Sequence, residues 1–341
     1  MSTSKPNVLI LMTTYNGETY LREQIESVLA QEGVSVSLRI RDDASSDGTW
    51  AILQKYAATH PNIEVARNEP NLGCINNFMG LVYGVGRSTW QHIGADASDA
   101  LPALDMPLPD LVAICDQDDV WLPNKLSVAA AALENATAGE HKAALYYAGI
   151  NNVDVNGTSL GNEYLPYKVC AEHYGSLLLV QNWCLGCTTL MNAALVELLQ
   201  QHPVYDFVRM YDAWIHAVAL YCGGVVVSDL EHSYINRRIT GTNTVGVMNE
   251  KRSPAYIAAK AFRWLLSKDE QTAAKHTGMA RVLFREYASC MDEDTAQLVC
   301  DVATREESSQ ARARLAKRPD ICMTTPLRTR WLRAMLRLNR F

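Results

Sequence analysis

The first 135 residues alternate between short apolar runs of strand length and segments whose apolar residues have helical spacing. Four runs are predicted to be strands: 7–14, 37–43, 63–66 and 111–115. The segments after them are predicted to be helices: 20–31, a stretch through Trp50 and Tyr56, 76–85, and a stretch that follows Pro123. This repetition predicts an α/β fold with a Rossmann-like, mostly parallel sheet sandwiched by helices. Ligands of such sheets bind at the carboxyl ends of the strands.

One long segment interrupts the alternation. Residues 86–110 contain four aspartates and three prolines and show little periodicity. We interpret this segment as a surface loop inserted between a helix and a strand. Its length exceeds that of most connections, which favours a lid or contact segment, although a plain solvated insertion explains the composition equally well.

The second half of the chain has weaker signals. Strands are predicted within 143–155 and 224–234, and helices at 193–200 and 212–221. From residue 250 onward the pattern is mostly helical, which predicts a C-terminal helical extension.

The composition is that of a folded globular protein. The chain has 341 residues, of which 48% are hydrophobic and 20% are charged, enough for one large core with an appendage or for two domains. The sequence contains neither a run of about eighteen apolar residues nor an apolar segment before the first strand. We therefore expect a cytoplasmic protein without a transmembrane helix. No nucleic-acid recognition motif accompanies the basic residues, so nucleic-acid binding is not expected.

The cysteines favour free thiols. There are nine of them, an odd number, in a chain without an export signal. Cys184 and Cys187 form a single C-x-x-C pair, which is weak evidence for zinc because a structural zinc site usually needs two such pairs.

The motif with the clearest chemistry is Asp116-Gln117-Asp118-Asp119, which directly follows the run 111–115. Carboxylates this close together repel one another unless a cation or hydrogen-bond donors compensate. Mg²⁺ and Mn²⁺ prefer oxygen ligands, commonly one or two carboxylates plus the phosphates of a substrate. We therefore predict a site for a metal and a diphosphate. A helix N-cap at Asp118 or Asp119 is the simpler alternative, but a cap needs only one carboxylate.

Polar clusters also follow the first two predicted strands. Asp42 and Asp43 end the second strand, where an acidic residue can bond a ribose or base; turn formation explains them equally well. Residues 13–18 include Thr, Tyr and Asn, which can contact a base, but they lack the glycine-rich dinucleotide and P-loop patterns. A fourth candidate is Asp212, at the start of the predicted helix 212–221, where a single Asp is usually a cap.

Five ordered blocks of the sequence resemble the family 2 glycosyltransferases, especially their bacterial rhamnosyltransferase-like branch. They are TTYNGETYLREQIESVLAQ, RDDASSDGTW, DQDDVWLPNKL, QNWCLGCTTLMN and YDAWIHAVALYCGGVVV, and the end of ITGTNTVG adds to them. The resemblance covers roughly residues 5–246. It implies a GT-A catalytic domain over 1–246, with 86–110 as an inserted loop, followed by a C-terminal helical region over 247–341.

The resemblance also implies roles for individual residues. Donor-binding residues of the family fall on Thr13, Tyr15, Asp43 and Asp116. The direct ligand of a divalent metal, Mn²⁺ or Mg²⁺, falls on Asp118. Asp212 falls on the family's general base, so the resemblance favours a catalytic role over a cap. The acceptor side is expected at three neighbouring residues: Trp183, Cys184 and Gly186.

Two positions depart from the family pattern. Tyr211 stands where related sequences usually have His before the catalytic Asp, and Thr240 stands where they often have a late His. If that His assists the metal or the diphosphate, His232 or Arg237 must take its place.

The resemblance implies an inverting transfer of a sugar, for which dTDP-rhamnose is the first expected donor and a UDP-hexose the next. The acceptor is expected to be a saccharide or a lipid-linked saccharide in bacterial surface polysaccharide synthesis. An alternative is a catalytically silent nucleotide-sugar-binding subunit of a polysaccharide assembly complex. A nucleotidyltransferase can share such a sheet, but the glycine-rich basic loop that it needs after the first strand is absent.

The C-terminal segment 328–341 has five arginines, no acidic residue and several large apolar residues. It predicts a basic amphipathic helix. Such a helix can lie on an anionic membrane, which suggests a peripheral position at the inner face of the plasma membrane. The alternative is a helix that packs its apolar stripe against the rest of the protein.

Overall fold

The computed structural model describes residues 5–94, 101–162, 179, 182–204, 210–240, 270–323 and 326–340. Its first half contains the predicted strands β1 (Asn7–Thr14), β2 (Ser35–Asp42), β3 (Ile63–Arg67) and β4 (Leu111–Cys115). The predicted helices are also present: α1 (Leu21–Leu29), α2 (Thr49–Thr59), α3 (Cys74–Tyr83) and α4 (Lys125–Thr137). The alternation of strands and helices is therefore confirmed.

The predictions for the second half of the chain are also confirmed where the structure describes it. The two predicted strands are β6 (Ala144–Val153) and β9 (Val225–Arg238). Three short strands were not predicted: β5 (Val120–Trp121), β7 (Ser159–Asn162) and β8 (Leu190–Asn192). The helices are α5 (Ala193–Gln201) and α6 (Tyr211–Tyr221).

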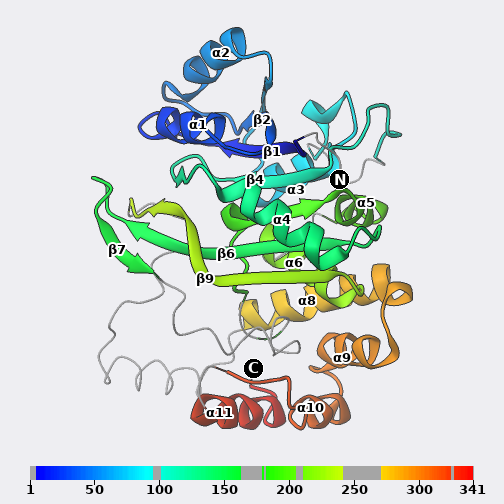
Figure 1. Cartoon of the computed structure of the whole chain (residues 1–341). Helices are drawn as coiled ribbons and strands as arrows, with labels where there is room; N and C mark the ends of the chain where they lie inside the picture. Colours follow the sequence, from blue (N-terminus) through cyan, green and yellow to red (C-terminus); the bar gives the residue numbers. More distant parts are fainter. Residues whose placement is uncertain are drawn as a thin grey trace.

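All of these strands belong to one mixed sheet with the order β3-β2-β1-β4-β8-β6-β9-β5, and β7 pairs with β6 at its side (Figure 1). β1 pairs in parallel with β2 and β4, and β2 with β3, while β6 and β9 also run parallel to each other. β8 is antiparallel to both of its neighbours, and β5 is antiparallel to β9. The sheet is thus mostly parallel, as expected.

β1 lies inside the sheet and is buried on both faces. Val8, Ile10 and Met12 belong to one hydrophobic cluster, with α1, α2 and α4. Leu9 and Leu11 point to the opposite face and belong to the cluster that contains α3, α5 and α6. Since successive side chains of a strand alternate between faces, a strand covered on both sides needs the uninterrupted apolar run seen here.

The inserted segment 86–110 is described except for residues 95–100. It contains a short 3₁₀ turn, Trp90–His92, and Trp90 and Ile93 are both buried in the core cluster on the α3 side of the sheet. The interpretation of this segment as a plain surface loop is therefore wrong for its first part. Arg41 donates a hydrogen bond to the carbonyl of Ile93 (2.6 Å), which ties the segment to β2.

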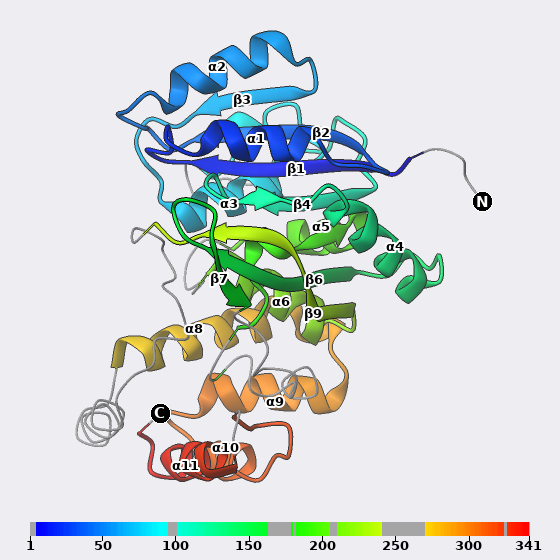
Figure 2. The ribbon, with the colours of Figure 1, turned by 60° about the vertical axis from the view of Figure 1, so that its left-hand side comes forward.

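The C-terminal region is helical, as predicted, with α8 (Glu270–Tyr287), α9 (Glu293–Thr304), α10 (Ser309–Leu315) and α11 (Pro326–Arg337). These helices lie beyond the β6–β9 side of the sheet (Figures 1 and 2). Tyr287 joins the two parts, because its hydroxyl donates to the carbonyls of Leu198 and His202 and its ring lies 6.0 Å from that of Trp214. The expected boundary at residue 246 falls outside the described residues.

The tail helix α11 packs its apolar stripe inside the protein. Leu332, Met335 and Leu336 are 0%, 4% and 1% exposed. The expectation that this stripe lies on a membrane is therefore wrong, because the surface that would enter the lipid already contacts the other C-terminal helices. The arginines of the segment include exposed ones at 328, 330, 337 and 340.

Two further observations concern membrane-spanning helices and the state of the cysteines. No helix among the described residues is both long and apolar enough to cross a membrane. The cysteines of the described segments are free thiols.

The packing of α11 can be tested by comparing Leu332→Ala with Leu338→Ala. Leu332 is fully buried, so its truncation should lower the free energy of unfolding by about 2–5 kcal/mol through lost contacts and a cavity. Leu338 is 62% exposed, and its truncation should change that free energy by no more than about 0.5 kcal/mol. Urea unfolding followed by circular dichroism measures both, and equal effects would contradict the packing.

Candidate functional site

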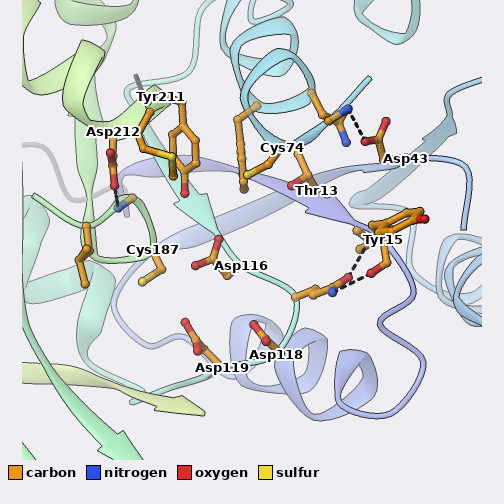
Figure 3. A pocket seen from close by; sticks show the side chains of 18 of the residues that line it. Thr13, Tyr15, Asp43, Cys74, Asp116, Asp118, Asp119, Cys187, Tyr211 and Asp212 are labelled. Atoms are coloured by element: carbon orange, nitrogen blue, oxygen red, sulfur yellow. Dashed lines mark hydrogen bonds between the residues drawn. The ribbon is translucent and has the colours of Figure 1, made fainter. Parts of the chain in front are cut away.

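The candidate site is a cleft at the carboxyl ends of β1, β2 and β4. These ends lie side by side because Thr14 is paired with Asp42, and Met12 with Cys115. The cleft has a volume of about 590 Å³. Its lining includes seven of the nine site residues expected from the sequence: Thr13, Tyr15, Asp43, Asp116, Asp118, Gly186 and Asp212. Residues from three predicted clusters and from the start of α6 therefore meet in one place (Figure 3).

Trp183 and Cys184 are the exceptions. The side chain of Trp183 is only 6% exposed and does not line the cleft, although it belongs to the same hydrophobic cluster as α5 and α6. Cys184 is likewise buried outside the lining. Of the three residues expected on the acceptor side, Gly186 alone reaches the cleft.

The loops around the cleft are clamped together by side-chain amides. Gln117 accepts a hydrogen bond from the backbone N–H of Tyr15 (2.8 Å) and donates one to its carbonyl (3.0 Å). Asn16, which has a positive φ of 49°, accepts a hydrogen bond from the N–H of Ser46 (2.8 Å). These contacts fix the backbone on either side of Tyr15, whose side chain remains 52% exposed and free to stack on a planar ligand.

Asp42 and Asp43 have different roles. Asp42 is fully buried and builds the turn, since it accepts hydrogen bonds from Thr14, from the N–H of Ser45 and from the hydroxyl of Ser45. Asp43 lines the cleft, and its carboxylate accepts from the N–H groups of Leu72 and Gly73, each at 2.8 Å. The turn interpretation holds for Asp42, whereas Asp43 is available to a ligand and also anchors the loop that leads into α3.

The acidic motif is an electrostatically unfavourable group. Burial raises the pKa of Asp116, Asp118 and Asp119, and that of Asp118 reaches about 6. The negative charge of Asp116 raises the pKa of the other two further. Arg237 lies close enough to lower all three. The carboxylates therefore need more positive charge than this arginine alone provides.

A divalent cation fits this donor set. Ligand atoms of Asp116, Asp119 and Cys187 lie within 4.8 Å of one another. One carboxylate oxygen of Asp119, Oδ2, is buried without a hydrogen-bond partner among the described residues. Neither Asp118 nor Asp119 caps α4, whose N-cap is Asn124, so the capping alternative is wrong. Asp118 lines the cleft but is not part of the close group.

The structure distinguishes between the two cations expected to compensate for Thr240. Arg237 lines the cleft beside the acidic motif. His232 does not line it; its side chain is 65% exposed and pairs with Asp229 at 2.6 Å. Thr240 is also absent from the lining. Of these two side chains, Arg237 lies beside the acidic motif and His232 lies outside the cleft.

Asp212 lies in the first turn of α6 on the opposite wall of the cleft. It does not cap the helix, because the N-cap is Met210. Its carboxylate accepts hydrogen bonds from the N–H groups of Ala213 (2.6 Å) and Gly186 (3.3 Å). Burial nevertheless raises its pKa to about 7, and these hydrogen bonds offset only part of that shift. A carboxylate with such a pKa can accept a proton near neutral pH.

Two residues behind Asp212, the half-buried Asn182 and the buried His216, escaped the sequence analysis. Asn182 donates a hydrogen bond to Asp212 (3.0 Å), and its carbonyl oxygen lies 3.0 Å from Nδ1 of His216. Burial lowers the pKa of His216 to about 4, so this histidine is neutral and holds the asparagine without adding charge. A signal was present, since His216 follows Asp212 by four residues and lies on the same face of the helix.

Tyr211 fills the position where the family usually has His. Its ring lies 4.2 Å from that of Phe78, and its hydroxyl donates a hydrogen bond that helps keep Asp116 ionised. A Cβ atom at position 186 would collide with this ring, so only glycine fits there. Tyr211 therefore connects the two walls of the cleft.

Other lining residues were not recognised in the sequence. Asn71, Cys74, Asn77 and Phe78 come from the loop after β3 and from the start of α3. Nothing in their order along the chain marks them as a group, because the turn that brings them to the cleft is held by Asp43.

Comparison with known proteins gives a consistent result. Residues 9–82 match the family model described as Glycosyl transferase family 2. The chain is 30% identical over 138 residues to the dTDP-rhamnosyl transferase RfbG of Shigella flexneri, an alignment that covers 40% of this chain and 42% of that protein. It is 27% identical over 191 residues to the Bacillus subtilis protein named as a teichuronic acid biosynthesis glycosyltransferase, TuaG, covering 56% and 64%. The chain thus spans less than half of the first of these relatives.

The fold also resembles that of a solved structure, residues 1–349 of TarS from S. aureus in complex with UDP-GlcNAc. The TM-score is 0.50 at 15% identity, and the match covers 98% of this chain and 93% of that one. At this identity the likeness concerns the fold alone. It agrees with the GT-A architecture expected from the sequence: a mostly parallel α/β sheet followed by C-terminal helices.

The steric fit between Gly186 and Tyr211 can be tested with Gly186→Ala. The added methyl group must displace a buried ring, so we expect a loss of about 1–3 kcal/mol in the free energy of unfolding. Removing the ring makes room for the methyl group. The double variant Gly186→Ala/Tyr211→Ala should therefore be more stable than the sum of the two single losses predicts. Additive losses in denaturant unfolding would show that the two residues do not meet.

Proposed function

We propose that this chain, which belongs to glycosyltransferase family 2, is an inverting glycosyltransferase that moves a sugar from a nucleoside diphosphate donor to a saccharide acceptor. The observation that carries the proposal is the shared cleft. The residues expected to bind the donor lie on one wall, and a carboxylate with a pKa of about 7 lies on the other. The side chains that would bind a donor and the carboxylate that would remove a proton from an acceptor therefore line the same cleft.

The donor side begins at the ends of β1 and β2. The exposed ring of Tyr15 is placed to stack on the base, and Thr13 lines the cleft beneath it. Asp43 is proposed to accept a hydrogen bond from the nucleoside, since its position is fixed by the N–H groups of Leu72 and Gly73. Asp116 and Arg237 lie farther along the cleft and are proposed to face the ribose and the diphosphate.

A divalent cation, Mn²⁺ or Mg²⁺, is proposed to be held by the acidic motif, with Asp118 as the ligand that the family resemblance implies. When bound, such an ion offsets the negative charge that develops on a departing diphosphate. Arg237 supplies positive charge from the protein itself. Its guanidinium favours the ionised form of the neighbouring carboxylates and is available to the diphosphate as well.

Asp212 is proposed to be the general base. Its carboxylate accepts the proton of the acceptor hydroxyl while that oxygen forms a bond to the anomeric carbon and the bond to the diphosphate breaks. Because the attack comes from the face opposite the leaving group, one displacement inverts the configuration. The N–H of Gly186, with Asn182, orients the carboxylate.

The relative RfbG supports rhamnose as the transferred sugar and dTDP-rhamnose as the donor, since it is named a dTDP-rhamnosyl transferase. A UDP-hexose is the second candidate. We further propose an acceptor that is a saccharide or lipid-linked saccharide of a bacterial surface polysaccharide, and a cytoplasmic location. Any contact with an anionic membrane would be electrostatic, through the exposed arginines of 328–341, at about 1 kcal/mol for each basic residue.

The proposed activity predicts release of nucleoside diphosphate that depends on an acceptor and on Asp212. A screen of nucleotide sugars with Mn²⁺ identifies the donor by thermal shift, and turnover is then measured with candidate oligosaccharide acceptors. Asp212→Asn keeps the size of the side chain but removes the base, and turnover should fall by about 10²–10⁴-fold with donor binding unchanged. Normal donor binding without turnover for any acceptor would instead indicate a silent binding subunit.

The same base predicts a pH dependence. Asp212 accepts a proton only as a carboxylate, and its pKa is about 7. The value of kcat/KM should therefore be constant above that pH and fall by about tenfold for each pH unit below it. A profile that stays flat down to pH 5 would exclude Asp212 as the base.

Asn182 is predicted to be a positioning residue for this base. Its N–H stabilises the ionised form of Asp212, so Asn182→Ala should raise the pKa of Asp212 and move the pH profile upward by about one unit. Activity near that of the wild type should return at high pH. A loss that is the same at every pH would indicate only structural damage to the loop.

A further inference from the structure

We propose that Cys187 is a metal ligand in this cleft, where Asp116, Asp119 and Cys187 form a mixed oxygen–sulfur site that prefers a thiophilic divalent ion such as Zn²⁺ or Co²⁺ to Mg²⁺. The proposal concerns the cleft of the proposed function, but ion binding by these side chains does not require sugar transfer. Cys184, the other member of the C-x-x-C pair, has no part in it, since it does not line the cleft.

The geometry of the three side chains supports a common ion. One ligand atom from each lies within 4.8 Å of the other two. Asp116 and Asp119 come from the loop between β4 and β5, and Cys187 comes from the 3₁₀ turn Gly186–Thr188. Figure 3 shows the three side chains gathered in the same part of the cleft. Two separate segments of the chain thus converge on one point.

An unpartnered oxygen at this point is a second, independent observation. Asp119 is 2% exposed, and its Oδ2 atom has no hydrogen-bond partner among the described residues. Its other oxygen accepts a long bond, 3.3 Å, from the N–H of Arg238. A buried carboxylate oxygen without a partner is costly, and a cation supplies the missing interaction.

Burial and the charges of Asp119 and Asp116 raise the pKa of the Cys187 thiol, so its thiolate requires the positive charge of a bound ion. The thiol donates a hydrogen bond to Asp116, so its sulfur already faces the carboxylate. When an ion binds, the sulfur–metal bond replaces the sulfur–hydrogen bond and the proton passes to solvent, without any change in oxidation state. Lys125 and Arg237 are the cations that act on this thiol.

The charge of the site leaves room for a divalent ion. Asp116, Asp118, Asp119 and the thiolate would bring four negative charges if all were ionised, against two positive charges from Lys125 and Arg237. Arg238 also acts on Asp118, but its own charge is paired with Glu23 at 2.6 Å. The ammonium of Lys125 has no hydrogen-bond partner among the described residues and lies 3.8 Å from the ring centroid of Trp121, so it acts on the site by charge alone. A divalent cation would balance the remainder.

The donor set determines which ion is preferred. Mg²⁺ binds oxygen ligands almost exclusively and gains little from a thiolate. Co²⁺ and Zn²⁺ both bind nitrogen, oxygen and sulfur ligands more tightly than the early member Mn²⁺ of the Irving–Williams series. Zn²⁺ also accepts mixed carboxylate and thiolate ligands. One sulfur ligand should therefore shift the selectivity of an otherwise carboxylate site toward these ions.

Cobalt provides a direct spectroscopic test on the full-length, reduced and chelator-treated protein. Titration with Co²⁺ should produce a near-ultraviolet thiolate-to-cobalt charge-transfer band that saturates and resists an excess of Mg²⁺. In Cys187→Ser the band should disappear and Co²⁺ binding, measured by calorimetry, should weaken by more than about tenfold. Zn²⁺ added to the wild-type cobalt protein should remove the band by displacement.

Two cysteines serve as matched controls. Cys74 lines the same cleft outside the close group, and Cys184 is the buried neighbour in the C-x-x-C pair. Cys74→Ser and Cys184→Ser should both retain the band. Asp119→Asn keeps the thiol but removes a charged oxygen ligand, so it should weaken Co²⁺ binding even if Cys187→Ser fails to fold.

The absence of a charge-transfer band in the wild type, or a band that persists in Cys187→Ser, would overturn the proposal. Co²⁺ affinity unchanged in Asp119→Asn would also overturn it. The result of the cobalt experiment can be distinguished from that of the activity assay. A cobalt–thiolate band without turnover refutes the transferase. Turnover without the band refutes only the ligand role of Cys187.

Discussion

Buried negative charge is the constraint on which the rest of this structure depends. Asp116 and Asp119 lie in the loop that follows the central strand β4, and Asp212 faces them across the cleft. Burial raises the pKa of each, so each favours a proton or a cation over bare ionisation. A protein gains no stability from such an arrangement, because ionised groups without partners cost free energy. The arrangement makes sense as a binding site whose electrostatic cost is offset when a cation and a ligand bind.

The surrounding scaffold holds these charges in place. β1 is buried on both faces, so the strand ends that carry the cleft cannot shift without disturbing two hydrophobic clusters. The Gln117 amide joins the acidic loop to the loop after β1. On the far wall, Gly186 leaves just enough room for Tyr211, and Asn182 fixes the carboxylate of Asp212. These contacts hold the backbone next to the acidic motif and Asp212, while the ring of Tyr15 is left exposed.

The sequence predicted the secondary structure better than it predicted which residues pack against each other. The order of strands and helices was predictable because apolar periodicity is local, and the convergence of residues 13–18, 42–43 and 116–119 follows from the parallel sheet. The basic amphipathic tail was not decided by its own pattern, since the same stripe suits a lipid surface or a protein core. Burial of Leu332 settles that choice for the apolar stripe. Likewise, acidic and proline residues made 86–110 look solvated, yet Trp90 is packed in the core.

The sequence by itself determined the α/β architecture and the three polar clusters at the strand ends and, through family resemblance, led to the prediction that Asp212 is the general base. Only the tertiary structure decided which side chains act together. It separated Asp42, which builds a turn, from Asp43, which lines the cleft. It placed Arg237 rather than His232 beside the carboxylates, and it brought Cys187 to Asp116 and Asp119. The physical reason is that periodicity records which face of an element is buried, whereas charge balance depends on atoms that meet only after the chain has folded.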